Sequence, residues 1–142
     1  MDTRTTLHRV PRWLLGVMLL PAIVVLLPQA RAEGGEPEIP PGAQITSWHD
    51  NGHGGRYLLW LRQGRLMRPD DRFSGVVRSD TDCDPDDQGL NHCHNAIDLA
   101  NGRHIVVINT HEMSRNRCLG AGDKLTLTAI GPRWLVGTLV EK

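Results

Sequence analysis

The sequence lacks three features that would point to common classes of protein. It has no excess of basic charge, because 16 Lys and Arg residues balance 16 Asp and Glu residues. Its apolar run, residues 14–27, has 14 residues and contains Pro21, whereas a membrane-spanning helix needs about 20. No window shows a helical hydrophobic period. These absences argue against a nucleic-acid-binding surface, a stable membrane span and an α-helical fold.

The first 32 residues have the pattern of a cleavable signal peptide. Three arginines come first, the apolar run follows, and Ala30-Arg31-Ala32 matches the small-x-small sequence that signal peptidase reads. We therefore expect export to the periplasm or the medium; an uncleaved anchor is the alternative. Residues 1–32 hold four of the basic residues and one of the acidic ones, so 12 basic and 15 acidic residues remain, a formal charge of −3. This mild acidity also disfavours binding to nucleic acid.

The remaining chain predicts a small all-β domain. Residues 33–55 are rich in Gly, Pro and polar residues, so we expect a flexible N-terminal segment before a domain over 56–142. Short alternating stretches and turns at Asn101-Gly102 and Gly131-Pro132 indicate six or seven strands. With no helix to cover a sheet, a closed antiparallel barrel, SH3-like or OB-like, is favoured over a small sandwich.

Residues 83–94 are the densest group of metal-binding side chains, with two cysteines, two histidines and three aspartates. A two-residue loop at Asn101-Gly102 would place His92 opposite His111 and make His94 its diagonal neighbour. The three imidazoles would then share one face and converge on one ion. A three-residue loop would shift the register by one residue and separate them.

The three cysteines allow at most one intramolecular disulfide, and an oxidising compartment would preserve it. Cys93 would face away from the histidines, so it is expected to pair with Cys83 or Cys118. We favour Cys83–Cys93, which closes a short loop. Cys118 is then the odd thiol and a candidate fourth ligand. Three histidines with sulfur support favour copper or zinc.

The same region contains a weaker calcium-like pattern at Asp80, Asp82, Asp84 and Asp86. Pro85 stands where a calcium loop of the EF-hand type needs glycine, and Asn91 stands where it needs glutamate. A solvated acidic turn is therefore the simpler interpretation.

Three functional hypotheses follow from these patterns. The first is an exported barrel that binds copper or zinc, for metal handling or as a structural site. The second is a metal-free, disulfide-stapled module whose acidic loop, residues 80–91, contacts an envelope protein. The third is a metal-dependent hydrolase, but no general base or oxyanion hole is recognisable by spacing, so catalysis is not predicted.

Overall fold

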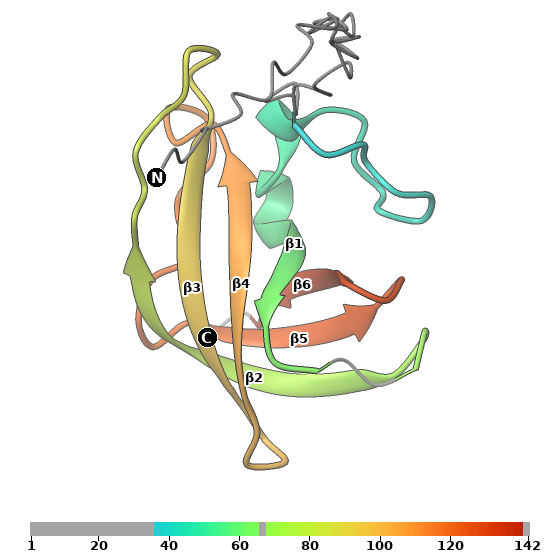
Figure 1. Cartoon of the computed structure of the whole chain (residues 1–142). Coiled ribbons are helices and arrows are strands. Elements are labelled where there is room, and N and C mark those ends of the chain that lie inside the picture. The colour runs from blue at the N-terminus through green and yellow to red at the C-terminus, as the bar shows by residue number, and fades with distance from the viewer. Residues whose placement is uncertain (1–35, 66–67, 141–142) are drawn as a thin grey trace, which may run out of the picture. The chain divides into compact units, whose positions relative to one another are not determined.

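Six strands close into an antiparallel barrel in the computed structural model, which describes residues 36–65 and 68–140 (Figure 1). Around the barrel the strands follow the order β1-β4-β3-β2-β5-β6, and β1 also pairs with β6. Their bounds are β1 Arg56–Gln63, β2 Arg72–Thr81, β3 Asn91–Leu99, β4 His104–His111, β5 Lys124–Ala129 and β6 Trp134–Leu139. The predicted all-β barrel is confirmed, and its strand number lies within the predicted range.

The only helical elements of the described residues are two 3₁₀ turns, η1 (Trp48–Asp50) and η2 (His53–Gly55). None of the helices in this part of the chain has the length and apolar character to cross a membrane. The predicted signal peptide, residues 1–32, lies outside the described residues.

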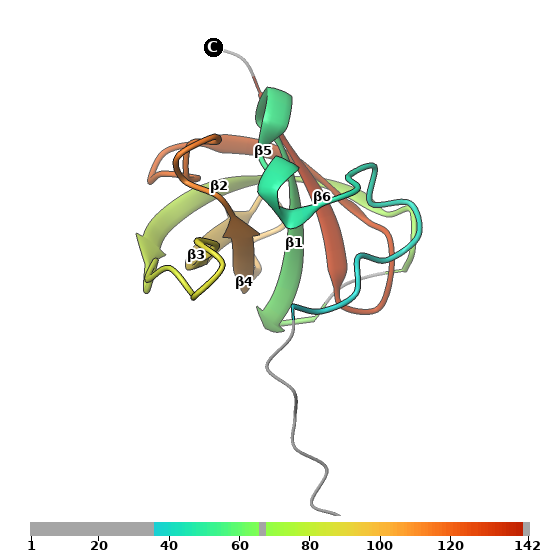
Figure 2. The same cartoon turned by 90° about the horizontal axis from the view of Figure 1, so that it is seen from above.

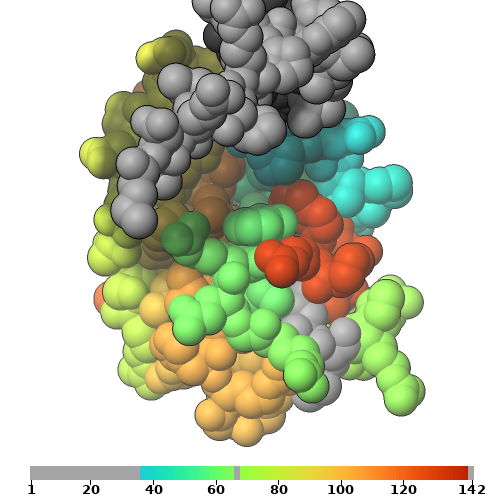
Figure 3. Space-filling view, in the orientation of Figure 1, coloured from blue at the N-terminus to red at the C-terminus, as the bar shows by residue number. Residues whose placement is uncertain are grey.

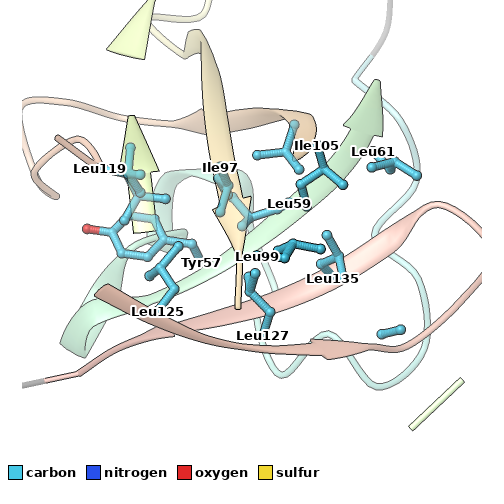
Figure 4. Packing of buried hydrophobic residues seen from close by; sticks show 13 residues of the cluster. Tyr57, Leu59, Leu61, Ile97, Leu99, Ile105, Leu119, Leu125, Leu127 and Leu135 are labelled. Atoms are coloured by element: carbon cyan, nitrogen blue, oxygen red, sulfur yellow. The ribbon is translucent and has the colours of Figure 1, made fainter. Parts of the chain in front are cut away.

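Alternate side chains of the strands fill the barrel, as a period of two requires. On β5 the buried residues are Leu125, Leu127 and Ala129, and the intervening threonines face outward. Figure 4 shows the side chains of this core meeting from several strands and from the loop that holds Leu119. The core consists of Tyr57, Leu59, Leu61, Val77, Ile97, Leu99, Ile105, Val107, Leu119, Leu125, Leu127, Ala129 and Leu135.

A second apolar cluster covers the outside of β1 and β6 with the segment before the barrel. Trp48 lies against Trp134, with ring centroids 6.0 Å apart. Ala43 is also buried, and Figure 3 shows this N-terminal segment beside the last strands. The segment that holds Ile39, Ala43 and Trp48 therefore packs on the barrel, although the sequence predicts a flexible segment up to residue 55.

Both predicted hairpins form, but each has a three-residue loop where two residues were expected. In the β3–β4 hairpin, the Leu99 amide donates to the Arg103 carbonyl, and Gly102 adopts a φ of 80°. Glycine tolerates this left-handed conformation, which follows a turn in three-residue loops of this kind. The predicted register is therefore wrong by one residue.

The β5–β6 hairpin differs in the same way. The Ile130 amide donates to the Trp134 carbonyl, so residues 131–133 form the loop. A two-residue loop at Gly131-Pro132, which the sequence suits, would turn Trp134 and Val136 to the core. Leu135 and Gly137 face the core instead, and Trp134 and Val136 join the outer cluster. Both faces of β6 are apolar, so the hydrophobic pattern did not distinguish the two registers.

Asn51 ties the N-terminal segment to the barrel, and its loss should destabilise the protein. Its buried amide donates to the carbonyls of Leu58 and Thr110, at 3.0 and 2.7 Å, and accepts from the Leu58 amide at 2.6 Å. Asn51→Ala should lower the free energy of unfolding by about 2–3 kcal/mol, because buried backbone groups lose their partners. Denaturant unfolding measures this. Asn101→Ala, in an exposed turn, is the control; an equal loss in both variants would contradict the assignment.

Candidate functional site

The observed register separates the three histidines that the sequence places together. His111 lies opposite Asn91, His92 opposite Thr110 and His94 opposite Ile108. The His111 side chain is fully buried inside the barrel, whereas the His92 and His94 side chains are 34% and 24% exposed on the outside. The predicted convergence of three imidazoles is therefore wrong, because the hairpin loop has one residue more than expected.

The three cysteines instead meet at one end of the barrel, together with Asp80. Cys83 and Cys93 form the disulfide that the sequence favours. Cys118 Sγ lies 3.9 Å from Cys93 Sγ, and Cys83 Sγ lies 3.3 Å from Asp80 Oδ1. One sulfur or oxygen atom from each residue lies within 4.8 Å of all the others. We call Asp80, Cys83, Cys93 and Cys118 the sulfur cluster.

A β-bulge in β2 explains why Asp80 points into this cluster. The pairing of β2 with β3 shifts by one residue between Val77 and Ser79. Strict alternation from the buried Val77 would turn Asp80 outward, and the extra residue reverses this. Asp80 Oδ1 then accepts a hydrogen bond of 2.9 Å from the buried Asn95 amide, which holds the carboxylate in place.

The loop after β4 is fixed on both sides of Cys118. The Tyr57 hydroxyl donates to the Arg117 carbonyl at 2.9 Å, and the Asn95 amide donates to the Leu119 carbonyl at 3.2 Å. The Leu119 side chain is buried in the core. Residues 82–90 and 112–123 both lie at the end of the barrel where β3 begins and β4 ends (Figure 2). Cys118 is therefore held beside the disulfide by core packing.

Burial and negative charge control protonation at this end of the barrel. Desolvation raises the pKa of the Cys118 thiol, and the nearby Asp80 carboxylate raises it further. Cys118 is thus a protonated thiol at neutral pH, a weak nucleophile toward the adjacent disulfide. Burial also lowers the pKa of His111, so its imidazole is neutral.

The aspartates of the calcium-like pattern make separate contacts. Asp80 belongs to the sulfur cluster, Asp82 Oδ2 lies 3.0 Å from His94 Nδ1, and Asp86 Oδ2 lies 3.2 Å from His92 Nε2. Asp84 is exposed. These four carboxylates do not surround a common point, as the oxygen ligands of calcium would.

The sequence indicated the cysteines as candidate ligands, but it did not indicate that Asp80 lies beside them or that Glu36 lies beside His92. Asp80 was assigned to the calcium-like pattern, because a bulge has no signature in its residues. Glu36, which lies 3.2 Å from His92 Nε2, belongs to the segment expected to be flexible. The apolar Ile39, Ala43 and Trp48 were the only signal that this segment packs on the barrel.

Acid should destabilise the wild type more steeply than a His111→Asn variant. In the unfolded chain the imidazole keeps its ordinary pKa of about 6.5, so it binds a proton below that pH. Burial lowers the pKa of His111 in the folded protein, so the folded imidazole stays neutral to a lower pH. The free energy of unfolding contributed by neutral His111 is thus present above pH 6.5 and falls as the pH decreases below it. Thermal melting between pH 7.5 and 5 measures the two slopes, and parallel slopes would contradict the prediction.

Comparison with known proteins gives no indication of the chemistry of this protein. No family model, no curated protein and no solved structure matches the chain. The described residues form a small six-stranded β-barrel with one disulfide and a sulfur and carboxylate cluster at its end.

Proposed function

We propose that the protein is an exported β-barrel that binds a transition metal, zinc or copper, through the sulfur cluster in its reduced form. The observation that supports this is the convergence of three sulfur atoms and one carboxylate, all within 4.8 Å of one another. Thiolates and carboxylates are zinc ligands, and thiolates also select Cu(I). Such a site would serve metal handling or stabilise the fold.

The spacing of the cluster suits a tetrahedral ion. Zinc–sulfur bonds of about 2.3 Å place two tetrahedral sulfurs about 3.8 Å apart. The Cys93 and Cys118 sulfurs are separated by 3.9 Å. A sulfur and an oxygen ligand would be about 3.5 Å apart, against 3.3 Å between Cys83 Sγ and Asp80 Oδ1. The bonded Cys83–Cys93 pair must separate for both sulfurs to bind the ion.

Reduction therefore controls whether the ligand set is complete. A dithiol reductant supplies two electrons and two protons, becomes a disulfide itself, and converts Cys83 and Cys93 into two thiols. Metal binding then releases the protons of the three thiols. With the disulfide closed, only Cys118 and Asp80 can donate without breaking a bond, which is too few for a stable site.

Hydrogen bonds from residues around the sulfur cluster already orient the proposed ligands, as such bonds do in metal sites generally. The Asn95 amide holds Asp80, and the Asn91 amide donates to the Cys83 carbonyl at 2.7 Å. Arg117 donates to the Cys118 carbonyl at 2.8 Å and brings positive charge near the cluster, where the ligands are anionic. Little rearrangement beyond the disulfide is needed.

The metal-free module is the second candidate function, and the disulfide is the observation that favours it. Cys83–Cys93 anchors the acidic loop to β3, and in the oxidised protein that loop would be a rigid surface for an envelope protein. The two candidates differ in what reduction does: it creates a metal site in the first and only loosens a loop in the second.

Reduced protein should bind one Zn²⁺ or Cu⁺ at the sulfur cluster, and oxidised protein should bind none there. Cobalt substitution followed by absorption spectroscopy reports thiolate ligation, and thiol counting should give one thiol before reduction and three after it. Cys118→Ser should weaken Zn²⁺ binding by more than about 100-fold, beyond the usual loss for an outer contact. His104→Gln, an exposed imidazole at the other end of β4, is the control.

Asp80→Asn should affect the affinity for zinc and the affinity for copper differently. Zinc would lose its oxygen ligand and bind much more weakly, whereas Cu⁺ held by the three thiolates would change little. If reduction adds no metal binding, or if Cys118→Ser binds as the wild type does, the metal proposal is wrong and the metal-free module replaces it.

A further inference from the structure

A second group of ligand atoms lies on the outside of the barrel and contains no sulfur. His92 Nε2 is 3.2 Å from Glu36 Oε1 and 3.2 Å from Asp86 Oδ2. One ligand atom from each of the three residues lies within 4.8 Å of the other two. The residues come from the N-terminal segment, the acidic loop and β3, so the group joins three parts of the chain.

Asp86 and His92 are held by contacts that leave one atom of each directed at the rest of the group. Asp86 Oδ1 accepts hydrogen bonds from the Gln88 and Leu90 amides, at 2.8 and 2.9 Å, so Oδ2 remains to face His92. His92 Nδ1 lies 3.1 Å from the Thr110 hydroxyl. That hydroxyl can accept a hydrogen bond from Nδ1–H. The Nε2 lone pair would then be directed at the two carboxylates.

Glu36 is the least satisfied member of the group. Its side chain is only 16% exposed, and its buried Oε2 has no hydrogen-bond partner among the described residues. A buried carboxylate oxygen without a partner is costly, because it has lost its water. Two carboxylates here face one imidazole, so a single positive charge at most offsets two negative ones.

The distances fit a bound ion better than a pair of ordinary salt bridges. Charge-assisted N–H···O bonds are about 2.7–2.9 Å long, and one Nε2 proton cannot point at both carboxylates at once. Nitrogen and oxygen ligands at about 2.0–2.1 Å from a tetrahedral zinc ion are about 3.3 Å apart. The two observed separations of 3.2 Å lie close to this value.

We propose that Glu36, Asp86 and His92 form a Zn²⁺ site that clamps the N-terminal segment onto the acidic loop. The imidazole favours zinc over calcium, which takes six to eight oxygen ligands. The site has three protein ligands and leaves the fourth position to water. It needs no thiol, so it works with the disulfide closed and is independent of the sulfur cluster.

Zinc titration of a Cys118→Ser protein, purified without reductant from cells expressing the full chain, tests this site alone. Calorimetry should show one Zn²⁺ per chain and a rise in melting temperature, because the ion binds the folded state. Glu36→Gln and His92→Gln should each weaken binding by more than about 100-fold. Thr110→Val should weaken it by about 10–100-fold, as the loss of an outer contact does.

His94→Gln is the matched control, since His94 lies on the same face of β3 and contacts a single carboxylate, that of Asp82. Its zinc affinity should equal that of the parent protein. If His92→Gln does not fold, Asp86→Asn replaces it, because asparagine keeps an oxygen for the Gln88 and Leu90 amides. Absence of zinc binding by the Cys118→Ser protein, or equal binding by all variants, would overturn the proposal and leave His92 as a simple ion pair.

Discussion

The three-residue loop of the β3–β4 hairpin determines which chemistry lies inside the barrel and which lies outside. With residues 100–102 in the loop, Cys93 and His111 face inward, while His92 faces outward. One residue fewer would put His92 on the same face as His111 and Cys93 on the opposite face, because side chains alternate along a strand. The sulfur atoms consequently gather at the end of the barrel, and one imidazole meets two carboxylates on its outer surface. Both groups depend on a turn that lies at the opposite end of the hairpin.

This separation also divides the ligands by chemical preference. The inner group is rich in sulfur and is held by buried amides, above all that of Asn95, which contacts both Asp80 and the loop carrying Cys118. The outer group has nitrogen and oxygen donors and is exposed to solvent on one side. In the proposed sites, reduction of Cys83–Cys93 would change the inner donor set and would leave the outer set unaltered. A single small barrel thereby presents two donor sets with different responses to their surroundings.

The architecture could be predicted from the sequence because it depends on local patterns. Short apolar stretches indicated the number of strands, and turn residues located both hairpins. Loop length was mispredicted, since Asn-Gly is typical of a two-residue turn, while Gly102 also suits the left-handed position of a three-residue loop. The β-bulge that turns Asp80 inward was also invisible, because it comes from the fit between β2 and β3 rather than from any residue type.

The sequence by itself determined an all-β domain and an odd number of cysteines, and it favoured Cys83 over Cys118 as the partner of Cys93, because strand periodicity and short chain separation act locally. Only the tertiary structure decided that Cys118 joins them, that Asp80 turns toward them and that Glu36 reaches His92. These contacts link segments far apart in the chain, and core packing sets them: Leu119 anchors one loop, and Trp48 anchors the N-terminal segment. Because β4 and β6 carry apolar residues on both faces, the hydrophobic pattern did not fix their pairing, whereas a shift of one residue changes every polar neighbour, so the sites required the coordinates.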